Sequence, residues 1–202
     1  AVQIEPFAGG EAAYRRRVAL LKEAQPEEPW SLEGERAADA ASGGPGAAFF
    51  AADGGEVLGF ARAQIDADVP EAGRRRLWVA VTHAARRRGI GTALLGAVGE
   101  AAAAGGATEF HVSTSLAEPD GPAFALARGF HEVEAEHELH LDLDAFAPGT
   151  SMVPAGITSL AALQRTDPDW FERYYRLHTT VEATVPWALG YAVPDREAFR
   201  RR

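Results

Sequence analysis

A run of arginine and glycine near the middle of the chain is the part of the sequence best suited to chemistry. It reads Arg86-Arg87-Arg88-Gly89-Ile90-Gly91-Thr92, follows an apolar stretch and opens a helix-forming segment. Free N–H groups at the start of a helix bind anions, and the helix dipole reinforces them. Glycine lets a phosphate approach the backbone closely, and arginine adds charged donors. The sequence therefore predicts a cradle for a pyrophosphate.

Three phosphate-binding patterns compete for this stretch. A Walker loop needs a lysine before its Ser or Thr, and the only lysine of the chain is Lys22. A Rossmann fingerprint needs a small residue where Leu94 stands and a first strand with a parallel neighbour, whereas a hairpin is expected before the cradle. The third pattern, Arg/Gln-x-x-Gly-x-Gly/Ala, is satisfied from Arg86 to Gly91.

This third pattern resembles the GNAT family of N-acetyltransferases. The resemblance covers residues 1–144 in element order, is strongest over Leu77 to Leu95 and recurs at Phe124 to Phe130. It implies that the loop holds the pyrophosphate of acetyl-CoA and that the preceding strand holds the pantetheine arm. The cofactor-binding residues implied are Val79, Ala80, Val81, Arg86, Arg87, Arg88, Gly89, Ile90, Gly91 and Thr92.

The resemblance also implies a reaction, the direct attack of an amine on the thioester of acetyl-CoA. Many family members carry a tyrosine that protonates the leaving thiolate, and Ala125 stands at that position here. The catalytic candidates are His111 and Ser115, which share a face of the strand expected after the cofactor helix. Two functions stay open: an acetyltransferase acting on a small amine, and a catalytically weak acetyl-CoA-binding module of a tandem acetyltransferase.

Charge favours a cationic acceptor. The chain has 20 basic and 29 acidic residues and a net charge of −9, which argues against general nucleic-acid binding and draws cations toward a cleft. Glu27, Glu28 and Glu33 lie where family members often line the acceptor cleft, with Trp30 beside them. We interpret Arg15 to Arg17 as a solvated charge run.

The elements that must position these residues follow from apolar periodicity and turn signals. A hairpin turn is expected at Asp53-Gly54-Gly55. Strands are expected over Val2–Phe7, Ala47–Ala52, Val57–Ala63, Leu77–Val81, Glu109–Ser115, Phe130–Ala135 and Glu138–Leu143. Helices are expected over Glu11–Ala24, from Ser31 toward Ala41, from the cradle to Ala104, and over Pro122–Arg128.

This element order predicts an α/β (α+β) class, and the resemblance implies a GNAT fold with a central mixed sheet of six to seven strands flanked by helices. We expect a GNAT domain over residues 1–144, a linker over 145–156, and a further segment over 157–202. That segment reads as a strand from Ile157 to Leu160, an aromatic helix from Asp167 and a last helix from Asp195. It resembles either the start of a second domain, as in tandem acetyltransferases of actinobacteria, or an extension that packs on the first domain or a dimer mate.

Composition sets the remaining expectations. No apolar run reaches the roughly 20 residues that cross a bilayer, no leader is visible, and cysteine is absent, so we expect a cytoplasmic protein without a membrane partner. No metal site is expected, because His137 and His140 would point to opposite faces of a strand. The sequence leaves the acceptor and the oligomeric state open, a homodimer included.

Overall fold

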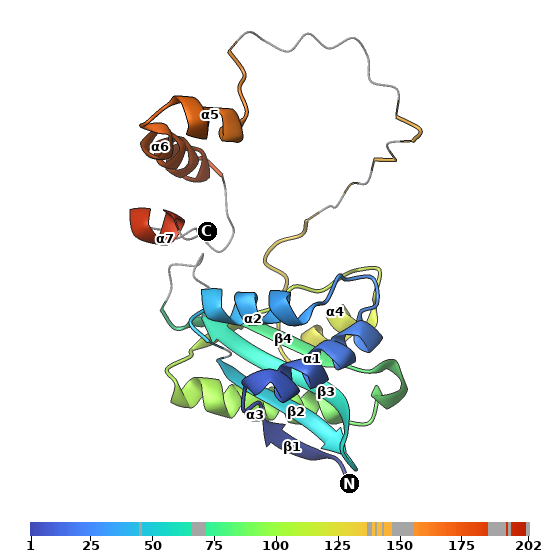
Figure 1. The fold of residues 1–202 in the computed structure, drawn as a ribbon. Helices are drawn as coiled ribbons and strands as arrows, with labels where there is room; N and C mark the ends of the chain where they lie inside the picture. The colour runs from blue at the N-terminus through green and yellow to red at the C-terminus, as the bar shows by residue number, and fades with distance from the viewer. Residues whose placement is uncertain are drawn as a thin grey trace. The chain divides into compact units, whose positions relative to one another are not determined.

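The computed structural model describes residues 1–44, 46–65, 72–136, 139, 141–142, 144–146, 156–185, 193 and 195–200. The chain divides into two compact units, Ala1–Pro122 and Ala123–Arg202. The first unit holds the sheet and the predicted cradle, and the second holds short helices (Figure 1). The fold class is confirmed as α/β with a mixed sheet and flanking helices.

The sheet contains five strands in chain order. They are β1 (Gln3–Pro6), β2 (Ala47–Asp53), β3 (Glu56–Ile65), β4 (Arg74–Val81) and β5 (Glu109–His111). The first four pair antiparallel, and β5 pairs parallel to β4. The predicted hairpin is confirmed: β2 and β3 meet at Gly54 and Gly55, whose φ angles of 60° and 91° suit glycine.

Helices cover both faces of the sheet. Helices α1 (Gly10–Ala24) and α2 (Leu32–Ala41) lie against one face, and α3 (Ile90–Ala104) lies against the other (Figure 1). On the α1 face, Phe7, Leu20, Phe50 and Phe60 belong to a buried hydrophobic core. On the α3 face, the helix buries Ile90, Leu94, Val98 and Ala102 at helical spacing. The unit thus has the two-sided layering that the sequence predicted.

The second unit contains the remaining helices. Helix α4 (Asp120–Leu126) crosses the boundary between the units, and α5 (Leu160–Thr166), α6 (Trp170–Glu182) and α7 (Arg196–Arg200) follow. The aromatic helix expected from Asp167 is present as α6. Its residues Phe171, Tyr175 and His178 pack around Phe199 of α7, with ring centroids 4.7–6.1 Å apart.

Several predicted strands are wrong. Residues 130–135 form no strand, and in the segment predicted from Ile157 to Leu160, residues 157–159 are coil and Leu160 begins α5. Ser159 caps α5 by accepting a hydrogen bond from the N–H of Ala162, which fixes a helix start where a strand was expected. Of the strand predicted over Glu138–Leu143, residues 138, 140 and 143 lie outside the described residues. The described sheet therefore has five strands in place of six to seven.

None of the helices in the described part of the chain combines the length and apolar character that a membrane crossing requires. Within those same residues, His, Asp and Glu side chains form no group of three or more that could hold a metal ion.

Candidate acetyl-CoA site

The predicted cradle lies between β4 and α3. After Val81 the chain makes one turn of 3-10 helix over His83–Ala85, passes the three arginines and enters α3 at Ile90. Two residues adopt left-handed backbone conformations: Arg87, with a φ of 63°, and Gly89, with a φ of 82° and a ψ of −3°. Among the described residues, Arg87 is the only non-glycine with a positive φ. Such a conformation is uncommon outside glycine and costs of order 1–3 kcal/mol, so the surrounding structure holds this loop in a specific shape.

The start of α3 offers backbone donors. Gly89 is the N-cap residue and has no side chain to satisfy the first N–H groups of the helix. The N–H groups of Ile90 and Gly91 therefore point out of the helix end, where the dipole contributes about half a positive charge. A Cβ built on Gly89 would meet nothing within 4 Å, so the space beside this N-cap residue is open.

The cradle is seated firmly on the sheet. A Cβ built on Gly59 of β3 would lie 2.9 Å from Leu94 Cδ1 and 3.3 Å from Ile90 Cγ2 of α3. It would also lie 3.0 Å from the carbonyl oxygen of Ala80 on β4. A glycine at this point of β3 therefore lets the first turns of α3 approach the strands closely. This contact sets the position of the helix start relative to β4.

The three arginines differ in what they contact. Arg86 donates to the carbonyl oxygen of Val81 at 3.3 Å, and its Nη1 lies 3.4 Å from Glu118 Oε2 and 3.7 Å from Asp120 Oδ2. Arg87 Nη1 lies 3.9 Å from Asp120 Oδ1. Arg88 is exposed and has no ion-pair partner within the described residues. Arg88 is thus the most available of the three guanidinium groups for an incoming anion.

The edge of β4 that faces β5 is paired along only part of its length. The parallel ladder to β5 joins Arg74, Arg75 and Arg76 to Glu109, Phe110 and His111 and goes no further. The three residues predicted to hold the pantetheine arm, Val79, Ala80 and Val81, lie beyond the end of that ladder. They keep their antiparallel pairing with β3 on the other edge. Within the described residues, this leaves the β5-side edge of β4 without a strand partner next to the cradle.

The two catalytic candidates lie after this edge. His111 is the last residue of β5 and is half-buried. Ser115 lies in the following coil, where its hydroxyl accepts a hydrogen bond from the N–H of Ala117 at 3.2 Å. The strand expected to run to Ser115 ends at His111, so the shared strand face that grouped these residues is absent. Ala125, which occupies the tyrosine position of the resemblance, is buried in α4.

The segment between α1 and α2 reaches β4 on the α1 face of the sheet. Trp30 stacks edge-on against Trp78 of β4, with ring centroids 6.1 Å apart and planes at 64°. Its indole N–H donates to the carbonyl oxygen of Gln25 at 3.0 Å. Glu27, Glu28 and Glu33 are exposed near this tryptophan in the sequence. Trp78 lies three residues before Val81, so this aromatic contact adjoins the open part of β4.

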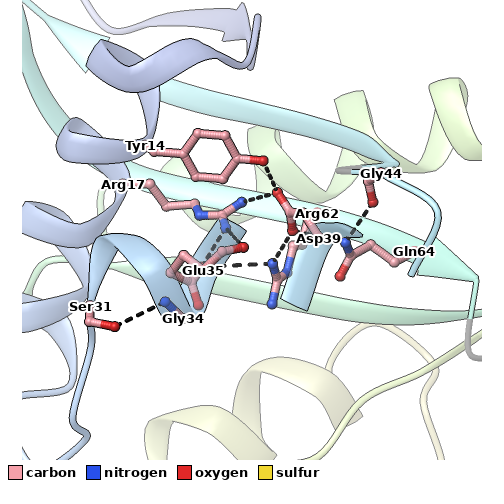
Figure 2. Close-up of polar contacts among 9 residues, drawn as sticks. All are labelled: Tyr14, Arg17, Ser31, Gly34, Glu35, Asp39, Gly44, Arg62 and Gln64. Atoms are coloured by element: carbon pink, nitrogen blue, oxygen red, sulfur yellow. Dashed lines mark hydrogen bonds and ion pairs between the residues drawn. The ribbon is translucent and has the colours of Figure 1, made fainter. Parts of the chain in front are cut away.

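The sequence analysis missed a buried charge cluster beside this face. Arg17, interpreted as part of a solvated run, has no exposed side-chain area and pairs with Asp39 and Glu35 of α2 at 2.8 and 2.7 Å. Figure 2 shows Tyr14 and Arg17 of α1 meeting Arg62 and Gln64 of β3 around these carboxylates. The missed signal was spacing: Arg17 and Leu21 lie one turn apart on the buried stripe of α1.

Burial in this charge cluster shifts two ionisation equilibria. Desolvation lowers the pKa of Arg62 relative to a solvated guanidinium, although Glu35 and Asp39 act in the opposite direction. Burial, followed by the hydrogen bond to Asp39, raises the pKa of Tyr14 above its ordinary value. At neutral pH the tyrosine therefore remains a hydrogen-bond donor.

Comparisons with known proteins agree with this geometry. Residues 45–132 match the family model described as an acetyltransferase (GNAT) domain. No match was found among curated proteins. Among solved structures, the chain is similar to the ribosomal-protein-S18-alanine N-acetyltransferase of Escherichia coli, with 18% identity and a TM-score of 0.57 over 71% of this chain and 86% of that one.

Two aminoglycoside-modifying enzymes are similar as well. The 6'-N-acetyltransferase of Acinetobacter baumannii has 21% identity and a TM-score of 0.54 over 71% of this chain and 99% of that one. An aminoglycoside N-acetyltransferase in complex with CoA has 22% identity and a TM-score of 0.54 over 70% of this chain and 95% of that one. At these identities the likeness shows the shared fold, and the family match over residues 45–132 includes the cradle. Residues 45–132 thus match an acetyltransferase (GNAT) domain model, and the chain shares its fold with N-acetyltransferases.

Proposed function

We propose that this domain transfers the acetyl group of acetyl-CoA to an amine of a small cationic acceptor by direct attack. The observation that carries the proposal is the cradle, which has a left-handed Gly89 with open space beside it and an exposed Arg88, next to an edge of β4 that no described strand pairs with. These features suit a pyrophosphate followed by an extended, amide-bearing arm. The donor set therefore fits acetyl-CoA.

Each part of the site has a proposed role in binding or in proton transfer. The N–H groups of Ile90 and Gly91, with Arg88, would bind the pyrophosphate, and β4 from Val79 to Val81 would hold the arm. When bound, acetyl-CoA supplies an acyl thioester that an amine can attack. His111 and Ser115 are our candidates for accepting the amine proton, through water where the distance requires it. These proposed roles rest on the place of His111 at the end of β5 and of Ser115 in the coil that follows.

The acceptor class rests on charge. The chain carries a net charge of −9, and the exposed Glu27, Glu28 and Glu33 lie within three residues of Trp30 in the sequence. These carboxylates attract a cationic amine, and the ring of Trp30 favours an amine that also presents apolar surface. The similar aminoglycoside and ribosomal-protein N-acetyltransferases act on amines of very different size, so the acceptor of this chain needs a direct test.

The direct test is amine-dependent release of free thiol from acetyl-CoA. The panel contains kanamycin, spermidine and a peptide with an N-terminal alanine, each measured against a reaction without amine. We expect thiol release above the background with at least one cationic amine, and a lower rate in His111→Ala. Release that never exceeds the background across the panel would count against the acetyltransferase proposal.

A second candidate function rests on Ala125. Without a phenol at this position the domain could bind acetyl-CoA without efficient turnover, as a module of a tandem acetyltransferase. In this proposal the first domain runs to residue 144, the linker covers 145–156, and residues 157–202 belong to a second GNAT-like domain or an extension. It predicts tight acetyl-CoA binding with no acetylation by this chain. Any amine-dependent acetylation by the chain alone would exclude it.

A further inference from the structure

Helix α2 is attached to the fold in an unusual way. Its buried residues are Glu35 and Asp39, and no apolar side chain of this helix is fully buried. A surface helix ordinarily docks through a stripe of apolar residues. Here two carboxylates one turn apart take the place of that stripe. The position of α2 therefore depends on charge pairing.

Asp39 is the centre of this attachment. Its Oδ2 accepts hydrogen bonds from the Tyr14 hydroxyl and Arg17 Nη1, both at 2.8 Å. Its Oδ1 accepts from Arg62 Nη1 at 2.8 Å and Gln64 Nε2 at 3.0 Å. The four donors come from α1 and β3, so one carboxylate joins three elements (Figure 2). A carboxylate has about four lone-pair sites, and all of them are used.

Arg17 completes the charge balance. It pairs with Glu35 Oε2 at 2.7 Å, and it also donates to the Glu35 carbonyl oxygen at 3.0 Å. Its guanidinium lies over the rings of Phe7, Tyr14 and Phe60 at 4.7–5.4 Å from their centroids. Two guanidinium groups face two carboxylates, so the cluster is neutral overall. Removing one member leaves a buried charge without its partner, which is strongly destabilising.

The attachment controls a segment that has little packing of its own. Residues 25–31 connect α1 to α2, and Gln25 and Trp30 are its only half-buried members. Besides short-range backbone hydrogen bonds, Trp30 contacts Trp78 of β4. The segment is therefore held between the end of α1 and the start of α2. Its position over β4 follows the position of α2.

We propose that Glu35 and Asp39 dock α2 onto Arg17 and Arg62 and thereby set Trp30 against β4, which makes Asp39 a positioning residue for the amine acceptor. The acceptor part of this inference rests on the proposed acetyltransferase function. The docking part rests only on the contacts above. A shift of α2 moves the wall formed by Trp30 while leaving the cradle on the other face of the sheet in place.

The experiment compares three variants of the full chain. Tyr14→Phe removes one hydrogen bond to Asp39 and keeps the aromatic ring, and Asp39→Asn removes the central charge. Arg15→Gln is the matched control, because Arg15 lies on the same helix in an exposed pair with Glu11. The readouts are amide hydrogen exchange by segment, the acetyl-CoA dissociation constant, and KM for the panel amine with the highest rate.

We expect Tyr14→Phe to raise exchange in residues 25–41 by roughly 10–150-fold, the effect of losing one hydrogen bond to a charged group. In the same variant, hydrogen exchange in residues 90–104 and the acetyl-CoA dissociation constant stay unchanged, while KM for the amine rises. Arg15→Gln matches the wild type in all three readouts. Unchanged exchange in 25–41, or an equal rise in 90–104, overturns the docking proposal. Raised exchange in 25–41 with an unchanged KM overturns the acceptor role.

The two proposals fail separately. If the wild type acetylates none of the amines, the acetyltransferase function fails, and hydrogen exchange still decides whether the carboxylates dock α2. Asp39→Asn extends the series: a folded variant should show a larger rise in residues 25–41 than Tyr14→Phe. A smaller rise would overturn the central role of Asp39. If Asp39→Asn does not fold, hydrogen exchange in Tyr14→Phe alone decides whether the carboxylates dock α2.

Discussion

Substitution of Gly89 tests whether the left-handed turn before α3 forms the anion cradle. Gly89 has a φ of 82°, and a Cβ there meets nothing within 4 Å. Gly89→Ala therefore adds backbone strain and a methyl group at the open helix end, without a clash inside the fold. The same helix carries a matched control at its other end, since Gly106 also has a φ of 82° and open space around its Cβ.

The expected stability loss is the same for both variants. A non-glycine residue in the left-handed region costs about 1–2 kcal/mol. For a chain of this length, each kcal/mol changes Tm by roughly 2–4 °C, so each variant should unfold about 2–8 °C below the wild type. Only Gly89→Ala disturbs the N–H groups of Ile90 and Gly91. The loss of one hydrogen bond to a charged group, about 1.5–3 kcal/mol, should raise its acetyl-CoA dissociation constant by roughly 10–150-fold.

The assay is isothermal titration of each variant with acetyl-CoA, after thermal unfolding has shown that both are folded. We expect weakened binding in Gly89→Ala and wild-type binding in Gly106→Ala. Equal affinity in all three proteins would refute the assignment of the cradle to this helix end. An equal loss in both variants would show that stability, and not the local geometry, controls the affinity.

Three further predictions concern the surroundings of the site. Folding raises the pKa of Tyr14, so its contribution to stability is complete below the unfolded pKa of about 10 and is lost as pH rises through the folded pKa. Denaturant unfolding between pH 9 and 11 should therefore show a smaller fall in the unfolding free energy for Tyr14→Phe than for the wild type. Glu118→Gln should tighten acetyl-CoA binding less than about fivefold, because it frees Arg86 from an exposed pair, and titration in high salt should remove the gain. Leu94→Ala should lower the unfolding free energy by about 2–5 kcal/mol in denaturant, because Leu94 is fully buried; a loss below about 1 kcal/mol would contradict its role in seating α3 on the sheet.

Local signals predicted the turn before α3 and the start of that helix. The hexapeptide from Arg86 to Gly91 contains its own turn chemistry, and the structure has the glycine turn and the helix start where the sequence indicated them. The hairpin at Gly54 and Gly55 and the cap at Ser31 are likewise short-range features. The left-handed conformation of Arg87 was not predicted, because no local preference of arginine favours it.

Long-range packing accounts for the failures. Arg17 has two arginine neighbours in the sequence, and the partners that compensate its buried charge, Glu35 and Asp39, lie 18 and 22 positions away. A strand was expected at residues 130–135, yet this segment pairs with no described strand. A strand needs a neighbour to satisfy its backbone, and that neighbour is not encoded in the segment itself.

The most direct test of the central claim is thermal unfolding of the full chain with and without acetyl-CoA, beside the Arg88→Glu variant. At a ligand concentration near 100 times the dissociation constant, binding should add about 2.7 kcal/mol of stability. At roughly 2–4 °C per kcal/mol this is a rise in Tm of about 5–10 °C. The account predicts this rise in the wild type and its loss in Arg88→Glu. A wild-type Tm that does not move with acetyl-CoA would contradict the assignment of this loop as an acetyl-CoA site.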